Sequence, residues 1–182
     1  MATTTQVRHG ANVLRALARN LDSRAFEPDF RSPLDHVSAR DAVTLLAWRQ
    51  GCTSEVLQFA LGLSQPACVR LVDRLVEAGL VGRERRAGHR RLHLSLTPAG
   101  ERAATEVLSR SGEPVERALR AAVPDRAELD GFVAVLERLV GVVLGDATDP
   151  SRFCRSCDVG ACLAGGLSCP SEEACRNAGE SM

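Results

Sequence analysis

The sequence contains no tyrosine, a single tryptophan and only 3% aromatic residues in total. Proteins that bind single-stranded nucleic acid stack unpaired bases on aromatic rings, so this composition argues against that class. No stretch approaches the roughly eighteen consecutive apolar residues that indicate a transmembrane helix. The first ten residues, MATTTQVRHG, lack the apolar segment of a secretory signal peptide. We therefore expect a cytoplasmic protein without a membrane span.

Lysine is absent as well, so the 23 basic residues other than histidine are all arginines. They balance 23 acidic residues, and the formal net charge is zero. The sequence also lacks a glycine-rich nucleotide-binding fingerprint and a clear set of catalytic residues. We therefore do not expect an enzyme, and the local distribution of charge becomes the informative property.

The chain of 182 residues is long enough for one domain with a hydrophobic core and a small appendix. We expect a mainly helical domain over residues 1–145. Five of the seven cysteines fall in the remaining segment, residues 146–182, which we expect to form the appendix. Seven cysteines in a cytosolic chain argue against a scaffold built on disulfides.

The sequence pattern of residues 53–97 predicts two helices that are joined by a turn and followed by a β-hairpin. The second helix should run from about residue 65 to 78, because Ser64 is a favourable N-cap, Pro66 is tolerated in the first turn and Gly79 suits a helix end. One face of this helix is apolar at helical spacing and carries Cys68, Leu71, Val72 and Leu75. The opposite face carries Gln65, Val69, Arg70 and Arg74.

The hairpin extends the positive charge of that opposite face. Its strands lie on either side of a tip at Ala87 and Gly88, and Leu92, Leu94 and Leu96 alternate as in a half-buried strand. Between Arg70 and His93 there are seven arginines against three acidic residues. A helix of this kind fits the major groove of double-stranded DNA, and a local basic surface of this kind is typical of a phosphate-binding face. His93 alternates with apolar residues, so we expect it to face solvent or phosphate.

Two sequence segments, GLSQPACVRLVDRLVEAGLVGR at 62–83 and RRLHLSLTPAG at 90–100, resemble the winged helix-turn-helix of the MarR family of bacterial transcription regulators. The resemblance implies a mainly α fold with a small β-hairpin wing, flanked by dimerisation helices. It also implies a homodimeric repressor that binds a palindromic operator in double-stranded DNA and responds to a small-molecule effector. In this resemblance the helix after Ser64 is the recognition helix and the hairpin from Arg83 to Leu96 is the wing.

The resemblance assigns DNA-binding roles to nine residues. Arg70 and Gln65 would contact base edges, and Ser64 and Arg74 would contact phosphates. Val69 stands where the family often has a small hydroxyl residue, so it offers only apolar contact, for instance to a thymine methyl group. The wing has Gly88 where the family often has an aspartate that orients the wing arginine. The full set is Ser64, Gln65, Pro66, Val69, Arg70, Arg74, Arg86, Arg90 and Arg91.

Further helices are expected on both sides of this unit. One should span about Gln6 to Leu21, and a second should open at Ser38, with Asp41 completing a short capping box. After the wing, Thr97 and Pro98 start a long helix that Gly112 and Pro114 should kink. Asp125 starts another helix with a wide apolar stripe. The first helix and the two after the wing are therefore candidates for a dimer interface.

The appendix contains cysteines in the spacing C-x2-C-x4-C-x6-C, namely Cys154, Cys157, Cys162 and Cys169. Four thiolates at such spacing can complete a tetrahedral metal site, with Cys175 as a substitute ligand. The motif Cys169-Pro170 is similar to the last ligand of some iron-sulfur proteins, whereas zinc is the commonest metal for four thiolates. The cysteines could therefore bind either an iron-sulfur cluster or zinc. The alternatives are that they are free thiols or form a redox-switched disulfide.

The placement of this cluster suggests that operator affinity responds to redox state or metal supply through the neighbouring dimerisation helix. Two alternative functions are a redox or electron-transfer protein built on the cysteines and a metal-stapled scaffold for protein interaction. Cys68 should be a buried, inert thiol, and the role of Cys52 stays open. His36, Trp48 and Arg49 are candidates for the border of an effector pocket.

Overall fold

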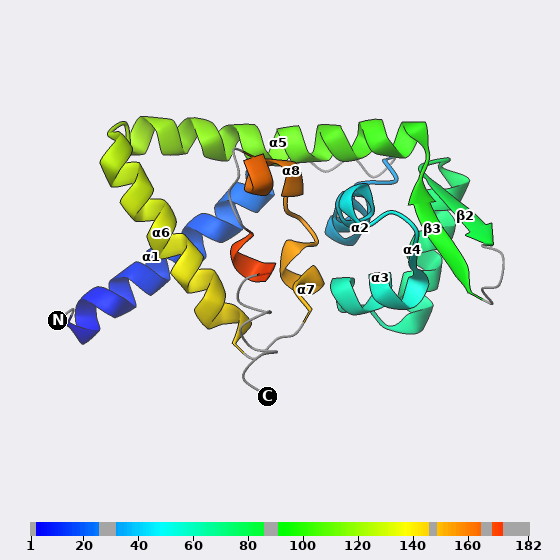
Figure 1. Ribbon diagram of the computed structural model, residues 1–182, viewed down its shortest axis with the longest axis horizontal. Coiled ribbons are helices and arrows are strands. Elements are labelled where there is room, and N and C mark those ends of the chain that lie inside the picture. The colour runs from blue at the N-terminus through cyan, green and yellow to red at the C-terminus, as the bar shows by residue number, and fades with distance from the viewer. Residues whose placement is uncertain (1–2, 26–31, 86–90, 146–148, 165–168, 173–182) are drawn as a thin grey trace.

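The computed structural model describes residues 3–25, 32–85, 91–145, 149–164 and 169–172, and a long helix organises it (Figure 1). This helix, α5, runs from a winged-helix region at one end to a second helical region at the other. The helices are α1 (Thr4–Ala25), α2 (Val37–Trp48), α3 (Ser54–Leu61), α4 (Gln65–Glu77), α5 (Pro98–Ala122), α6 (Arg126–Leu144), α7 (Ser151–Cys154) and α8 (Val159–Leu163). The strands are β1 (Cys52–Thr53), β2 (Val81–Arg85) and β3 (Leu92–Leu96).

The three strands form a small antiparallel sheet in the order β1-β3-β2. In the hairpin, Val81 pairs with Leu96 and Arg85 pairs with Leu92, while the N-terminal strand pairs Cys52 with Leu94. The predicted alternation of buried leucines holds at Leu94 and Leu96 but not at Leu92, which is 43% exposed. Leu92 lies farther along the wing, where the side chains no longer reach the core.

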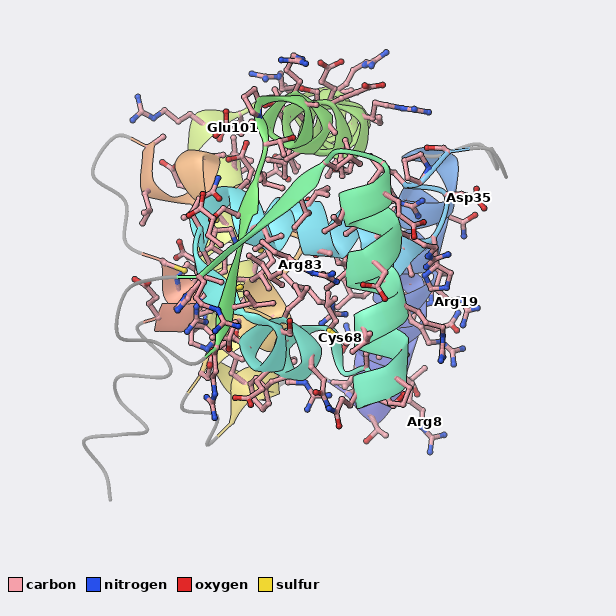
Figure 2. The ribbon with its side chains drawn as sticks, turned by 90° about the vertical axis from the view of Figure 1, so that its right-hand side faces the viewer. Arg8, Arg19, Asp35, Cys68, Arg83 and Glu101 are labelled. Atoms are coloured by element: carbon pink, nitrogen blue, oxygen red, sulfur yellow. The ribbon has the colours of Figure 1, made fainter. Side chains whose placement is uncertain are left out.

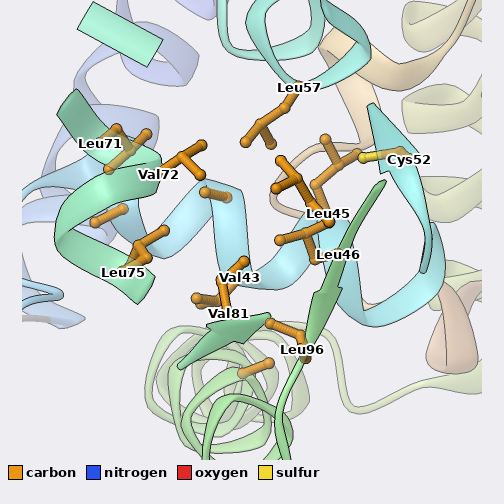
Figure 3. Packing of buried hydrophobic residues seen from close by; sticks show 14 of the residues in the cluster. Val43, Leu45, Leu46, Cys52, Leu57, Leu71, Val72, Leu75, Val81 and Leu96 are labelled. Carbon is orange, nitrogen blue, oxygen red and sulfur yellow. The ribbon is translucent and has the colours of Figure 1, made fainter. Parts of the chain in front are cut away.

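The hydrophobic core lies where α2, α3, α4, the sheet and the start of α5 meet (Figure 3). Helix α4 contributes the apolar face expected from its sequence, with Cys68, Leu71, Val72 and Leu75 all buried. Leu45, Leu46 and Leu57 are also completely buried, and truncation of such a leucine to alanine typically costs about 2–5 kcal/mol. This core fixes the orientation of α4 and therefore of its exposed face.

Two glycine-terminated helices define the helix-turn-helix. Gly62 and Gly79 have φ values of 64° and 70°, which is the left-handed region that glycine adopts without a steric penalty. At the second site the amide of Leu80 donates to Leu75 and the amide of Gly79 donates to Val76, which is a Schellman motif. The predicted helix end at Gly79 is therefore confirmed.

The start of α5 is held against the turn that follows α4. Thr97 is the N-cap, and its hydroxyl accepts from the amide of Gly100 and donates to the carbonyl of Gly79 at 2.6 Å. The amide of Thr97 donates to Leu80 as well. A Cβ atom at Gly100 would lie 2.0 Å from the carbonyl oxygen of Leu80, so only glycine fits this contact.

Two local sequence predictions differ from the structure. Helix α2 is capped by His36, whose Nδ1 accepts from the amide of Ser38, so the predicted cap at Ser38 is wrong. Helix α5 continues without interruption through Gly112 and Pro114, where a kink was expected. The caps predicted at Thr97 and Asp125 are confirmed, because both side chains accept from an amide of the first turn.

Helix α6 starts at the end of α5 that is remote from the wing, and α1 packs against α5 (Figure 1). No residue of α6 is buried in the single chain, and Val142 is 81% exposed. Large apolar side chains are exposed along both helices, including Val7, Val13, Leu14, Leu17, Phe132, Val133, Val135, Leu136, Leu139 and Val143. No described helix is long and apolar enough to cross a membrane.

Candidate functional site

The exposed face of α4 carries the residues that the sequence assigned to it. Gln65, Pro66, Arg70 and Arg74 are exposed, and Val69 is 46% exposed, although it is apolar. They are exposed because Leu71, Val72 and Leu75 on the other side of the helix anchor it in the core. Ser64 occupies the N-cap position as predicted, but its side chain makes no capping hydrogen bond.

Ion pairs join the wing to both helices of the helix-turn-helix. Arg83 on β2 pairs with Asp73 on α4, and Figure 2 shows Arg83 between the hairpin and that helix. Arg91 pairs with Glu55 on α3 at 2.7 Å, and both side chains are more than half exposed. Such an exposed pair contributes little to stability, so the Arg91 guanidinium can exchange it for a phosphate. Arg86 and Arg90, the other predicted wing contacts, lie outside the described residues.

His93 does not face outward as predicted. Its Nδ1 lies 2.6 Å from the carbonyl oxygen of Gly51, and because a carbonyl can only accept, Nδ1 donates. The imidazole therefore ties β3 to the turn after α2 and is half-buried. This correction removes His93 from the candidate phosphate contacts.

The residues predicted to border an effector pocket lie at opposite ends of α2. His36 lines a cleft of about 470 Å³ between the start of α2 and α4, together with Arg70, Leu71 and Arg74. Trp48 and Arg49 lie about 18 Å farther along the helix axis, at a rise of about 1.5 Å per residue. There the Arg49 guanidinium is 5.9 Å from the Trp48 ring centroid and 3.5 Å from Asp149. The three residues therefore do not line one pocket.

Two cysteines of the appendix contact one buried serine. Ser171 is 1% exposed, and its hydroxyl lies 2.7 Å from the sulfur of Cys154 and 3.0 Å from that of Cys169. Cys154 also exchanges a hydrogen bond with Cys157. Cys162 follows on α8, which is capped by Asp158 through the amide of Ala161. Among the four predicted thiols, the described contacts therefore join Cys154 and Cys169 through Ser171.

The thiols influence one another's protonation. The hydrogen bond from Cys157, helped by those from Ser171 and Cys169, lowers the pKa of Cys154 to about 6 despite its burial. The same bond, together with burial, raises the pKa of Cys157. Burial and the neighbouring Cys169 raise the pKa of Cys162. The group thus shares its protons unequally, as closely spaced thiols do.

No group of three or more cysteine, histidine or acidic side chains in the described parts of the chain already has the spacing of a metal site. Cys175, the predicted substitute ligand, lies outside the described residues. Elsewhere, Cys52 and Cys68 are buried, and burial raises the pKa of both thiols. The prediction that Cys68 is a buried thiol is confirmed.

The appendix contacts the helix-turn-helix, which the sequence analysis missed. Arg155 donates through Nε to Asp41 on α2 at 2.9 Å, and the Asp41 side chain is only 13% exposed. Arg152 lies over the ring of Phe59 on α3, 5.6 Å from its centroid. No local sequence pattern predicts these contacts, because Asp41 and Phe59 precede the arginines that they contact by more than 90 residues.

A comparison with known protein families supports the winged helix-turn-helix fold of the core domain. The MarR family model matches residues 41–92, which include most of α2, the helix-turn-helix, β2 and the first residue of β3. A comparison with curated protein sequences gave no match.

Solved structures share the architecture over most of the chain. A MarR family protein from Bacillus stearothermophilus is 24% identical with a TM-score of 0.66, covering 76% of this chain and 96% of its own. The MarR family transcription regulator SP03579 is 26% identical with a TM-score of 0.58, covering 75% and 89%. MepR, a transcription regulator of the Staphylococcus aureus multidrug efflux pump MepA, is 18% identical with a TM-score of 0.58, covering 73% and 97%.

Together, the sequence match over residues 41–92 and the shared architecture show that this chain has the winged-helix fold of MarR-family transcription regulators.

Proposed function

We propose that the protein is a sequence-specific transcription regulator that binds double-stranded DNA as a homodimer and acts as a repressor. The observation that carries the proposal is the exposed face of α4, which presents Gln65, Val69, Arg70 and Arg74 together on a helix anchored in the core. The major groove of B-DNA, about 12 Å wide, admits one α-helix. Arginine and glutamine are side chains that bind guanine and adenine edges through two hydrogen bonds.

Dimerisation is supported by the apolar surface of α1 and α6. Valine, leucine and phenylalanine side chains exposed along these two helices are costly in water, at about 25 cal/mol per Å² of apolar area. A second copy of the chain would cover them. It would also place a second α4 about one turn of DNA away, roughly 10 base pairs, so that a palindromic operator would match the two-fold symmetry.

A small-molecule effector is part of the same proposal. MepR has been solved with ethidium bromide bound, and its fold covers most of this chain. In this chain the cleft beside His36 and Arg70 is the place where an occupant would touch the recognition helix directly. A ligand there would compete with the use of Arg70 and Arg74 on DNA.

The test compares DNA binding by two arginine variants in the full-length chain. Arg70→Ala should weaken binding to a duplex from the promoter of its own gene by about 1–3 kcal/mol, with a smaller effect on random duplex. Arg120→Ala is the matched control, because Arg120 is exposed on α5 and pairs only locally with Glu116. Fluorescence anisotropy with labelled duplexes measures both. Equal affinities for the two variants would overturn the proposed docking of α4.

A further inference from the structure

The described appendix, residues 149–164 and 169–172, has almost no hydrophobic core of its own. Its buried residues are Ser151, Cys154 and Ser171, whereas Phe153 and Leu163 are 37% and 47% exposed. A segment with so little buried apolar area cannot offset the conformational entropy of folding without an added constraint. In small domains that constraint is commonly a disulfide or a metal ion.

The cysteines supply the ligands for such a constraint. The Ser171 hydroxyl contacts the sulfurs of Cys154 and Cys169 at 2.7 and 3.0 Å, and Cys157 hydrogen-bonds to Cys154. The turn that places Cys157 beside Cys154 is closed by a backbone bond of 3.1 Å between them. In the described residues these sulfurs do not form a ready metal site, so their side chains would have to rotate to face one metal ion.

The appendix is also attached to the part of the molecule that holds the recognition helix. The Nη2 atom of Arg152 lies 3.1 Å from the position that a Cβ would take at Gly62, in the turn between α3 and α4. The same guanidinium lies over the ring of Phe59 at the end of α3. Arg155 reaches Asp41 on α2, and Asp149 pairs with Arg49 at the other end of that helix.

We propose that Cys154, Cys157, Cys162 and Cys169 bind a thiolate-ligated metal centre, and that this centre holds Arg152 and Arg155 against α3 and α2 and thereby fixes the helix-turn-helix. Each thiol that becomes a ligand releases its proton to solvent. The chemistry is shared by Zn²⁺ and by an iron-sulfur cluster assembled from iron and sulfide. The effect on DNA rests on the proposed function, whereas the metal site and its effect on α3 do not.

The direction of coupling follows from the contacts. With the metal bound, the arginines stay in place and the turn at Gly62 is held, so α4 is presented to DNA in one orientation. Without it, the appendix loses its constraint and the two arginines are free to leave. Coupling free energies between sites in proteins typically change affinity about 5- to 150-fold. We therefore expect DNA affinity to fall at least about fivefold on metal loss.

The first experiment tests the site itself. The full chain, purified anaerobically, is analysed for zinc and iron and then, after removal of metal, titrated with Co²⁺ or reconstituted with iron and sulfide. One Co²⁺ per chain with a tetrahedral thiolate spectrum, or a coloured cluster, supports the site. Cys157→Ser should lose this signal and Cys52→Ala, which removes a thiol outside the cluster, should keep it. Failure of the chain to hold any of these metals would overturn the proposal.

The second experiment tests the coupling. Amide hydrogen exchange of residues 54–63 should slow on metal binding in the wild type and in Arg120→Ala, but not in Arg152→Ala, which should still bind metal. DNA anisotropy should show the same pattern, with the fivefold metal effect lost in Arg152→Ala. Metal binding without any change in exchange of residues 54–63 would overturn the coupling. Protected α3 with no DNA binding would support the metal site and its coupling to α3, and contradict the proposed function instead.

Discussion

Replacement of Gly100 by alanine tests how tightly α5 is fixed to the turn that follows α4. The new Cβ would lie 2.0 Å from the Leu80 carbonyl oxygen, 3.0 Å from its carbon and 3.1 Å from Leu96 Cδ2. The oxygen is backbone, so α5 must move by about 1 Å or more to restore an ordinary contact. That movement strains the hydrogen bonds from Thr97 to Gly79 and Leu80.

Two effects oppose each other in this substitution. Alanine is favoured over glycine inside a helix by about 1 kcal/mol. Overpacking costs about 1–3 kcal/mol, and each weakened hydrogen bond about 0.5–1.5 kcal/mol. The steric cost is larger, so Gly100→Ala should destabilise the protein by about 1–3 kcal/mol.

Gly112→Ala in the same helix is the matched control, because nothing lies within 4 Å of the Cβ it would add. At that position only the preference of a helix for alanine over glycine acts, so Gly112→Ala should be more stable than the wild type by about 0.5–1 kcal/mol. Urea denaturation at one fixed protein concentration measures both values. If both variants were equally stabilised, the close contact between α5 and Leu80 would be refuted.

Three further substitutions test the cap of α5, the hydrophobic core and the proposed dimer interface. Thr97→Ala removes the hydroxyl that caps α5 and binds Gly79, so unfolding free energy should fall by about 1–3 kcal/mol in a denaturant titration. Leu57→Ala empties a completely buried position on α3 and should cost about 2–5 kcal/mol in the same assay, unlike alanine at exposed Val69. Val142→Asp places a charge at an apolar position that is 81% exposed in the single chain, so sedimentation should show the dimer dissociating. An unchanged mass for Val142→Asp would place the dimer interface elsewhere.

The parts of the fold that the sequence predicted have local signals. The helix end at Gly79 and the caps at Thr97 and Asp125 each depend on residues within one helical turn. The buried face of α4 follows from 3.6-residue periodicity alone. Local signals also identified Cys154 and Cys169, whose sulfurs the structure places against Ser171.

Two of the errors, at Ser38 and His93, arose where distant residues decide the outcome. Ser38 and His36 are both possible caps for α2, and Asp41, which favoured Ser38, instead pairs with Arg155, 114 residues later. His93 turns inward because the Gly51 carbonyl, 42 residues earlier, accepts a hydrogen bond from its Nδ1. The contacts of Arg152 with Phe59 and Gly62 likewise depend on how the appendix folds back, which no local pattern encodes.

The central claim is that two copies of α4, held at fixed spacing by α1, α5 and α6, bind adjacent turns of duplex DNA. Sedimentation of the full chain with a labelled duplex from its own promoter, across a series of salt concentrations, tests it most directly. Two chains per duplex should bind, with affinity that falls steeply as salt rises because phosphate contacts release counterions. A monomer that ignores the duplex at low ionic strength would contradict the claim.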